Sequence, residues 1–140
     1  MEMIDVNGAL YGTTVSGGRG CNGYGCGTVF EVSTSGGGSI LYSFEGGKDG
    51  EQPLGGLTDV DGTLYGTTQV GGAHHDWTVF ELNPSTGAEQ VLYNFEGGKD
   101  GADPEAGLIS VNGVLYGTTK LGGGSTNCSG GCGTVFDVTP

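Results

Sequence analysis

Short runs of β-branched, aromatic and aliphatic residues, separated by glycine-rich turns, follow one another along the whole chain. Their shortness and the absence of a helical period predict β-strands throughout. The runs are of four types, named a, b, c and d in chain order. We expect strands at 3–6, 57–60 and 108–111 (a), 10–14, 64–68 and 115–119 (b), 28–32, 78–82 and 134–138 (c), and 40–44 and 91–95 (d).

The four types recur as a tandem repeat with a period near 51 residues. The string Leu-Tyr-Gly-Thr-Thr starts at positions 10, 64 and 115, and Thr-Val-Phe followed by an acid starts at positions 28, 78 and 134. Such self-similarity indicates a structure built from like units. The sequence therefore predicts a single array over residues 1–140, with units 3–52, 53–103 and 104–140, of which the last is incomplete.

Turn-forming pairs join the a and b runs of each unit, at Asn7-Gly8, Asp61-Gly62 and Asn112-Gly113. Such pairs favour type I′ hairpins, in which both central residues need a positive φ. The segments between c and d, 33–39 and 83–89, are also rich in turn formers. Each unit is therefore predicted to be a four-stranded antiparallel meander.

A single meander cannot bury both of its faces, so we expect the units to stack. The b runs carry apolar or small residues on both faces, as sheets enclosed between neighbours do. Radial stacking gives a β-propeller, and linear stacking gives a solenoid or a fibre. We favour all-β propeller blades, two complete and one lacking its outer strand, over the alternative of a linear stacked β-repeat fibre.

Glycine accounts for 33 of the 140 residues, and 16 acidic against 4 basic residues give a formal charge of −12. So much glycine excludes a helical bundle, because each interior helical glycine costs about 1 kcal/mol relative to alanine. The charge argues against unaided binding to nucleic acid or to an anionic membrane. The sequence has no run of about 18 apolar residues, so we expect no membrane-spanning helix.

Three motifs carry a resemblance to a known family. They are Gly-Leu-x-x-Val-Asn-Gly-x-Leu-Tyr-Gly-Thr-Thr, Gly-Thr-Val-Phe-Glu-Val and Leu-Tyr-x-Phe-x-Gly-Gly-x-Asp-Gly-x-x-Pro. Together they resemble the GloVer tandem repeat over essentially the whole chain. The resemblance implies a secreted, often surface-anchored bacterial protein whose repeats form propellers, with a blade order like that of NHL-type propellers. It implies no particular chemistry.

The third unit stops after its c run, so an unpaired strand edge is expected at Thr134, Val135, Phe136, Asp137 and Val138. Such an edge is a template for another chain. Three interpretations stay open. Two copies of three units each would supply six, enough for a ring, copies joined end to end would give a filament, or the sequence is a piece of a longer array.

All four cysteines lie between b and c runs, as Cys21 and Cys26 in the first unit and Cys128 and Cys132 in the third. The favoured interpretation is two local disulfides, each worth about 2 kcal/mol in the chain-entropy description. A zinc site and free thiols are the alternatives. Disulfides fit an oxidising compartment, so we expect a secreted protein, extracellular or on the cell surface.

Asp49 and Asp100 recur in the string Gly-Gly-Lys-Asp-Gly, and Glu51, Asp103 and Glu105 lie nearby. Carboxylates among flexible glycines suit Ca²⁺, although the spacing of an EF-hand is absent. An Asp-Gly pair is also an ordinary turn, which is the favoured interpretation. We therefore expect no cofactor, with calcium at Asp49 and Asp100 as the alternative.

The second unit carries His74, His75 and Asp76 where the other units carry cysteines, and Trp77 where they carry a glycine. In a meander this loop lies on the same side as the loops between units, so we expect any ligand face there. A solvated loop with a packed Trp77 is the favoured interpretation. Stacking of Trp77 on a sugar ring is the alternative.

The sequence predicts no enzyme, because it has no nucleophile with its base, no phosphate loop and no justified pair of carboxylates. We expect an extracellular structural or adhesive module that assembles through its β-repeat units. Copies of itself are its expected partners, with a cell-surface glycan or protein as a further one. The alternative is a glycan- or small-ligand-binding propeller that uses His74, Trp77 and the acidic loops, and a propeller lyase or hydrolase comes third.

Overall fold

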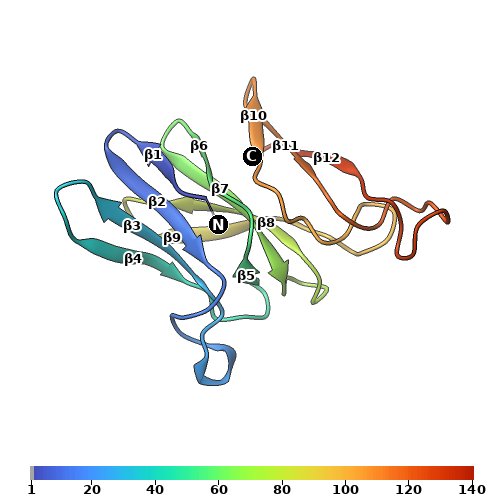
Figure 1. Cartoon of the computed structure of the whole chain (residues 1–140), viewed down its shortest axis with the longest axis horizontal. Coiled ribbons are helices and arrows are strands. Elements are labelled where there is room, and N and C mark those ends of the chain that lie inside the picture. Colours follow the sequence, from blue (N-terminus) through green and yellow to red (C-terminus); the bar gives the residue numbers. More distant parts are fainter. Residues whose placement is uncertain (1) are drawn as a thin grey trace.

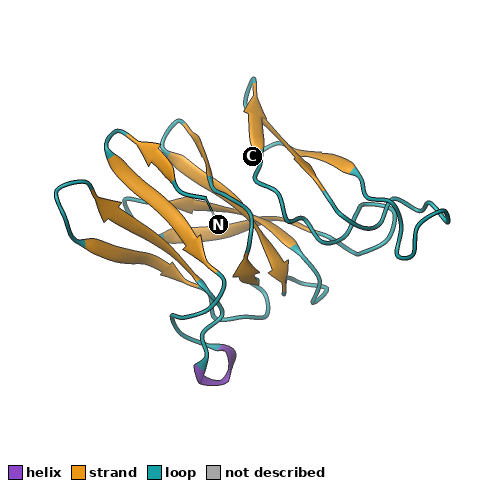
Figure 2. Ribbon diagram, in the orientation of Figure 1, coloured by secondary structure: helices purple, strands orange, loops and turns teal. Residues whose placement is uncertain are grey.

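The computed structural model describes residues 2–140, where strands make up all regular structure apart from one short 3-10 helix, η1 (Cys21–Gly23). The strands form three antiparallel sheets that follow one another along the chain. Figure 1 shows these sheets side by side, and Figure 2 shows the loops that join their strands. The all-β class predicted from the sequence is confirmed.

Each sheet is built on the predicted meander. The first sheet has the order β1 (Ile4–Val6), β2 (Ala9–Thr14), β3 (Thr28–Ser33) and β4 (Gly38–Ser43). The second contains β6 (Thr58–Val60), β7 (Thr63–Val70), β8 (Thr78–Asn83) and β9 (Ala88–Asn94), and the third contains β10 (Ile109–Val111), β11 (Val114–Thr118) and β12 (Val135–Val138). These bounds agree with the expected a, b, c and d runs to within a few residues.

One strand that the sequence did not predict, β5 (Glu51–Pro53), widens the second sheet to five strands. β5 pairs with the far end of β7, where Pro53 lies opposite Thr68. An isolated bridge between Ala102 and Leu121 makes the equivalent link in the third unit. The segments between units are thus fastened to the sheet that follows. β5 also spans the boundary expected between residues 52 and 53, and the unit boundaries themselves stay predictions.

Tight turns of the expected type join the first two strands of every meander. In the first sheet φ is 54° at Asn7 and 85° at Gly8, and the equivalent pairs of the other two sheets are also positive. Asparagine and aspartate tolerate this left-handed backbone, and glycine adopts it without strain. The predicted type I′ hairpins are therefore confirmed.

A glycine in the second strand of each meander leaves room for a phenylalanine ring on the third strand. Gly66 lies opposite Phe80 in the β7–β8 register, and a Cβ on Gly66 would lie 2.6 Å from Cζ of Phe80. The pairs Gly12–Phe30 and Gly117–Phe136 repeat this arrangement. The ring therefore packs directly on the backbone, which explains the glycine inside each Leu-Tyr-Gly-Thr-Thr string.

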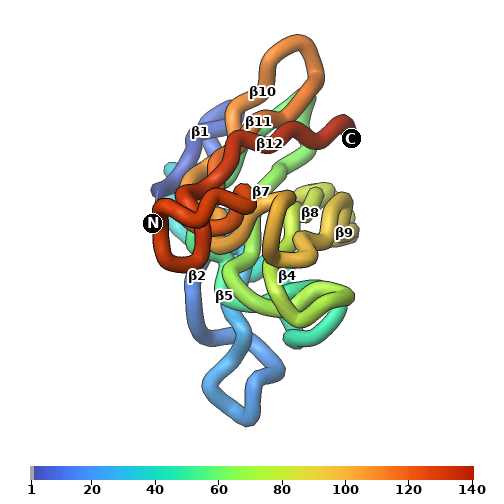
Figure 3. The backbone as a smooth tube through the Cα atoms, turned by 90° about the vertical axis from the view of Figure 1, so that its right-hand side faces the viewer, coloured from blue at the N-terminus to red at the C-terminus, as the bar shows by residue number. Residues whose placement is uncertain are grey.

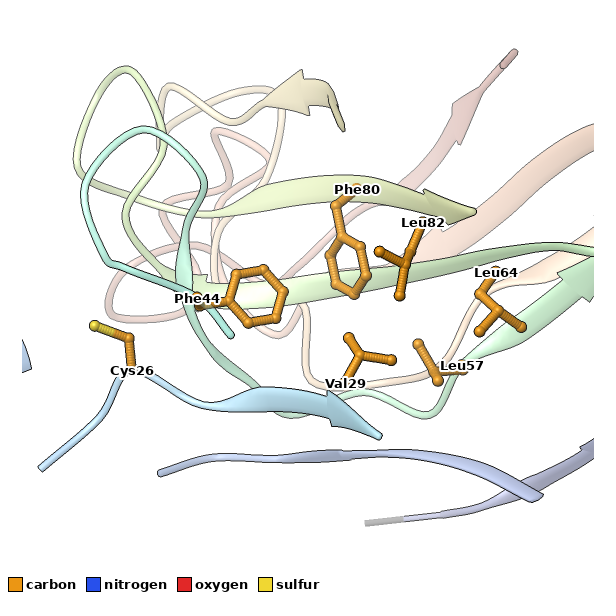
Figure 4. Close-up of a cluster of buried hydrophobic side chains, with 7 residues drawn as sticks. All are labelled: Cys26, Val29, Phe44, Leu57, Leu64, Phe80 and Leu82. Carbon is orange, nitrogen blue, oxygen red and sulfur yellow. The ribbon is translucent and has the colours of Figure 1, made fainter. Parts of the chain in front are cut away.

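The sheets pack face to face, and a core fills the first boundary between them (Figure 4). Its fully buried members include Val29 and Phe44 from the first unit and Leu64, Phe80 and Leu82 from the second. The Phe44 ring meets the Phe80 ring edge-on, with centroids 5.2 Å apart and planes at 73°. Pairs of this geometry contribute about 0.5–1.5 kcal/mol beyond the area they bury.

The second boundary repeats the first. Phe95 meets Phe136 edge-on with centroids 5.0 Å apart, and Val79 packs in the same cluster as Leu115. The front face of a sheet is therefore the side that points toward the following sheet, and the rear face is the side that points toward the preceding one. Within residues 2–140 only the second sheet is packed on both faces. Within residues 2–140 the three sheets do not close into a ring (Figures 1 and 3).

Candidate functional site

The loop between β2 and β3 is braced by a disulfide. This loop projects beyond the sheets (Figures 2 and 3), and Cys21 and Cys26 are joined in it with Cα atoms 5.2 Å apart. Cys26 is fully buried, and its carbonyl accepts a 2.7 Å hydrogen bond from the N–H of Gln52. This hydrogen bond therefore ties the disulfide-braced loop to the connection that leads to the second sheet.

A carboxylate lies against this disulfide. Oε2 of Glu51 is 2.8 Å from Sγ of Cys21, and the ligand atoms of Cys21, Cys26 and Glu51 all lie within 4.8 Å of one another. A cysteine in a disulfide has neither an S–H proton to donate nor a thiolate to bind a metal. In the disulfide form this cluster therefore offers no zinc site, and the approach of Glu51 is a contact without a hydrogen bond.

The second disulfide joins Cys128 and Cys132 in the exposed loop between β11 and β12. No cysteine of the described residues is free, so the prediction of two local disulfides is confirmed. Both disulfides suggest an oxidising compartment. Over residues 2–140 there is no helix with the length and apolar character needed to cross a membrane.

Asp49 and Asp100 close equivalent loops through the same hydrogen bonds. Oδ2 of Asp49 accepts one bond from the N–H of Glu45 at 2.8 Å and one from the hydroxyl of Tyr42 at 3.0 Å. Asp100 accepts the same two bonds in the next unit, at 2.8 and 3.1 Å. Each aspartate thus has a structural part in its loop. In the described part of the chain neither belongs to a cluster of three metal-ligand side chains, and calcium stays the untested alternative.

Glu89 on β9 adds a carboxyl group beside Tyr42 and Asp49, across the first boundary. Burial, followed by the negative charge of Asp49, raises the pKa of Glu89 from 4.5 to about 7. Its Oε1 is buried and has no hydrogen-bond partner. Burial, followed by the charges of Glu89 and Asp49, also raises the pKa of Tyr42. A carboxyl group with a raised pKa therefore lies at the contact between the first two units.

The loop between β7 and β8 carries the predicted ligand-face residues. His74 and His75 are exposed, whereas Asp76 and Trp77 are half-buried. Trp77 packs against the second core, and its Cζ3 lies 3.2 Å from the position of a Cβ on Gly97. The indole therefore packs on the loop that leads to the third unit, while His74 and His75 are exposed. Ligand binding by this loop stays the untested alternative.

One repeat position changes from buried to exposed at the end of the array. Val29 and Val79 are fully buried in the two boundaries, whereas the equivalent Val135 is 77% exposed. Tyr65 is 6% exposed and its equivalent Tyr116 is 37% exposed. Because the residue types are the same, the difference comes from the neighbouring sheet, which the third front face lacks among the described residues.

The open front face of the third sheet is named the tail face and consists of Ile109, Val111, Tyr116 and Val135. Ile109 is 62% and Val111 is 49% exposed. A shallow pocket of about 200 Å³ on this face is lined by Ile109, Tyr116 and Val135 together with strand backbone. Contiguous apolar side chains of this kind are typical of interaction surfaces.

The open rear face of the first sheet is named the head face and consists of Met3, Leu10, Phe30 and Val32. Met3 is 55% exposed, whereas leucines at the same repeat position, Leu57 and Leu108, are 4% and 5% exposed. The other three head-face residues are half-buried. Their equivalents in the second sheet are fully buried, namely Leu64, Phe80 and Leu82.

The segment predicted as an open edge, 134–138, forms β12 from Val135 onward. In the described part of the chain β12 pairs only with β11, whereas β8 pairs with strands on both sides. A groove of about 290 Å³ beside β12 is lined in part by Tyr93, Asp100 and Asp137. Thr134 lies just before the strand, where its hydroxyl is 2.8 Å from that of Thr119.

The candidate sites predicted from the sequence were the edge strand and the loops, and they did not include the head and tail faces. The signal that could have found them lies in the repeat itself. Within residues 2–140, positions of the first and third units that align with core positions of the second unit have a neighbouring sheet on one side only. Val135, which aligns with Val79, is the clearest example.

Three stacked meanders, each with a phenylalanine ring packed on a glycine of the neighbouring strand, define an all-β tandem-repeat protein. The chain belongs to the Gloeobacter/Verrucomicrobia repeat family, whose family model matches residues 1–136. The match confirms the resemblance to the GloVer repeat that the three motifs carry. No curated protein matches the chain.

Proposed function

We propose that this chain is an extracellular structural or adhesive module that works by assembly of its repeat units, without catalysis. The observation that carries the proposal is the burial of one repeat position. Val29 and Val79 are fully buried where another sheet follows, and Val135 is 77% exposed where none follows within residues 2–140. When repeat units bury their apolar faces only against neighbouring units, each face without a neighbour is available as a binding surface. The two disulfides support a location outside the cytoplasm.

We also propose that the units are blades of the β-propeller type. Each is an antiparallel meander, and the short first strands β1, β6 and β10 lie near one another, with β6 between the other two, as inner strands around an axis do. Three blades are too few for a closed ring, since propellers usually contain about four to eight. Two copies would supply six. Linear stacking is the alternative, and it would build a filament from the same contacts.

Negative-stain electron microscopy of the chain over a range of concentrations tests the assembly. The proposal predicts rings or filaments, and the shape decides between radial and linear stacking. Micrographs without assemblies at every concentration would contradict it.

A ligand-binding role is the second candidate, and a groove of about 570 Å³ beside β4 favours it. Arg19, Ile40, Tyr42 and Glu45 are among its lining residues. An aromatic surface with a few charged groups suits a sugar or another small polar ligand. Screening the labelled chain on a glycan array tests this role, and an array without hits counts against it.

A further inference from the structure

We infer that two copies of this chain join head to tail, with the tail face of one copy packed on the head face of the next. The inference rests on the proposed function, because it names the partner and the polarity of the assembly. Each joint would repeat between copies the contact that the chain makes twice within itself. Such a contact is heterologous, so it extends into a ring if the rotation closes and into a filament if it does not.

Both internal boundaries have the same polarity. At the first boundary the front-face residue Val29 packs with Leu64 and Phe80 of the next rear face, and at the second Val79 packs with Leu115. The tail face is a third front face, and the head face is a third rear face. Each open end therefore carries the half of this contact that the other end lacks.

The head face has the same side-chain packing as the buried rear face of the second sheet. Cγ of Met3 and Cζ of Phe30 lie 3.1 Å and 2.7 Å from the position of a Cβ on Gly12. Leu57 and Phe80 cover the equivalent glycine of the second sheet in the same way. The surface that receives a valine and a tyrosine inside the chain is thus preorganised at its open end, which lowers the entropic cost of binding.

Pairing of two tail faces is disfavoured. It would oppose two front faces, an arrangement that neither internal boundary contains. Asp137 lies on the same side of β12 as Val135, so tail-to-tail pairing would also bring two carboxylates together, and like charges across an interface disfavour association. In a head-to-tail joint Asp137 takes the position of Glu31 and Glu81, which are half-buried within the chain.

The effect of salt on assembly distinguishes this apolar contact from one held by ion pairs. Two copies with a formal charge of −12 repel each other, whereas the head and tail faces are mostly apolar. Salt screens charges beyond about 10 Å at about 0.1 M, and it leaves the burial of apolar surface intact. Head-to-tail assembly should therefore strengthen with added sodium chloride, while an assembly held by ion pairs would weaken.

Two variants test the polarity, Met3→Lys in the head face and Val135→Lys in the tail face. Both replace exposed side chains, so the fold is expected to survive, and melting curves check this. Each lysine also reduces the net negative charge, so a loss of assembly cannot come from added repulsion. Tyr24→Lys is the matched control, because Tyr24 is 86% exposed in a loop outside both faces.

Sedimentation equilibrium gives the masses of the wild type, of each variant alone and of an equimolar mixture of the head and tail variants. The inference predicts that the wild type and Tyr24→Lys exceed the chain mass of 14.0 kDa. Each face variant alone should stay monomeric. The mixture should form pairs that do not grow further, because only one intact head and one intact tail can meet.

The outcomes separate the inference from the function on which it rests. If the wild type assembles but the mixture stays monomeric, head-to-tail packing is wrong and assembly by another contact remains. A Met3→Lys variant that still dimerises alone would overturn the inference in favour of tail-to-tail pairing. A wild type that is monomeric at every concentration and salt level would overturn both the inference and the proposed assembly.

Discussion

The ring of Phe44, the residue that follows β4, meets the edge of the Phe80 ring on β8 at a centroid distance of 5.2 Å, across the first boundary between repeat units. Phe95 and Phe136 make the same contact at the second boundary. The phenylalanine that follows the outer strand of one unit therefore packs its side chain into the core at the boundary with the next unit. The stability of a unit thus depends on its neighbour, as it does in other repeat proteins.

Replacing Phe44 or Phe80 by leucine is expected to lower the free energy of unfolding by about 1–3 kcal/mol, because both rings are fully buried. In a double-mutant cycle the two losses should couple by about 0.5–1.5 kcal/mol, the contribution of an edge-on pair. Urea unfolding of the four proteins measures the coupling. Ile40→Ala on β4 is the control, because Ile40 is 60% exposed. Strictly additive losses would show that the two rings do not stabilise each other.

Gly66→Ala is expected to destabilise the chain by about 1–3 kcal/mol through overpacking, because the added Cβ would lie 2.6 Å from Cζ of Phe80. Gly56→Ala is the matched control, since its Cβ would meet no atom closer than 3.4 Å. Thermal unfolding measures both. Equal effects of the two substitutions would contradict the packing of the ring on the strand.

Asp49→Asn is expected to lower the free energy of unfolding by about 1 kcal/mol, because it weakens the charge-assisted hydrogen bonds from Glu45 and Tyr42. Asp137→Asn, at an exposed position, is the control. Melting temperatures are measured in EDTA and in calcium chloride, and a purely structural role predicts the same loss in both. A wild-type melting temperature that Ca²⁺ raises, and that Asp49→Asn makes insensitive to Ca²⁺, would instead establish a calcium site.

Glu89 is expected to make the stability pH-dependent. Its folded pKa of about 7 lies above the ordinary value of 4.5, so the stabilisation that comes from its neutral form is complete below pH 4.5 and is lost as the pH rises through 7. Glu89→Gln stays neutral, so the variant should gain on the wild type between about pH 5 and about pH 8. The expected gain is about 1–2 kcal/mol, after discounting the pKa shift for partial solvent exposure.

Urea unfolding at several pH values measures this gain, with Glu45→Gln at an exposed position as the control. A difference between Glu89→Gln and the wild type that stays constant over this pH range would falsify the environment assigned to Glu89.

The meanders could be predicted because their signals are local and occur three times. The Asn7-Gly8 turn and the Gly12 that faces Phe30 each follow from a short stretch of sequence. β5 could not be predicted, because Glu51–Pro53 shows no apolar alternation and contains a proline. It becomes a strand because the end of β7 offers it an edge.

The head and tail faces could not be read from local sequence for a different reason. Val79 and Val135 both follow a threonine and precede a phenylalanine, yet one is fully buried and the other is 77% exposed. Only the presence of a neighbouring sheet separates them. The environment of Glu89 is likewise non-local, since Tyr42 and Asp49 reach it from another unit.

The central claim is that the open faces of the first and third sheets are covered by another copy of the chain. Hydroxyl-radical footprinting with mass spectrometry, at rising protein concentration, tests it most directly. The account predicts that labelling of Met3 and Tyr116 falls as the concentration rises, while labelling of Tyr24 in its exposed loop stays constant. Labelling of Met3 and Tyr116 that does not change with concentration would contradict it.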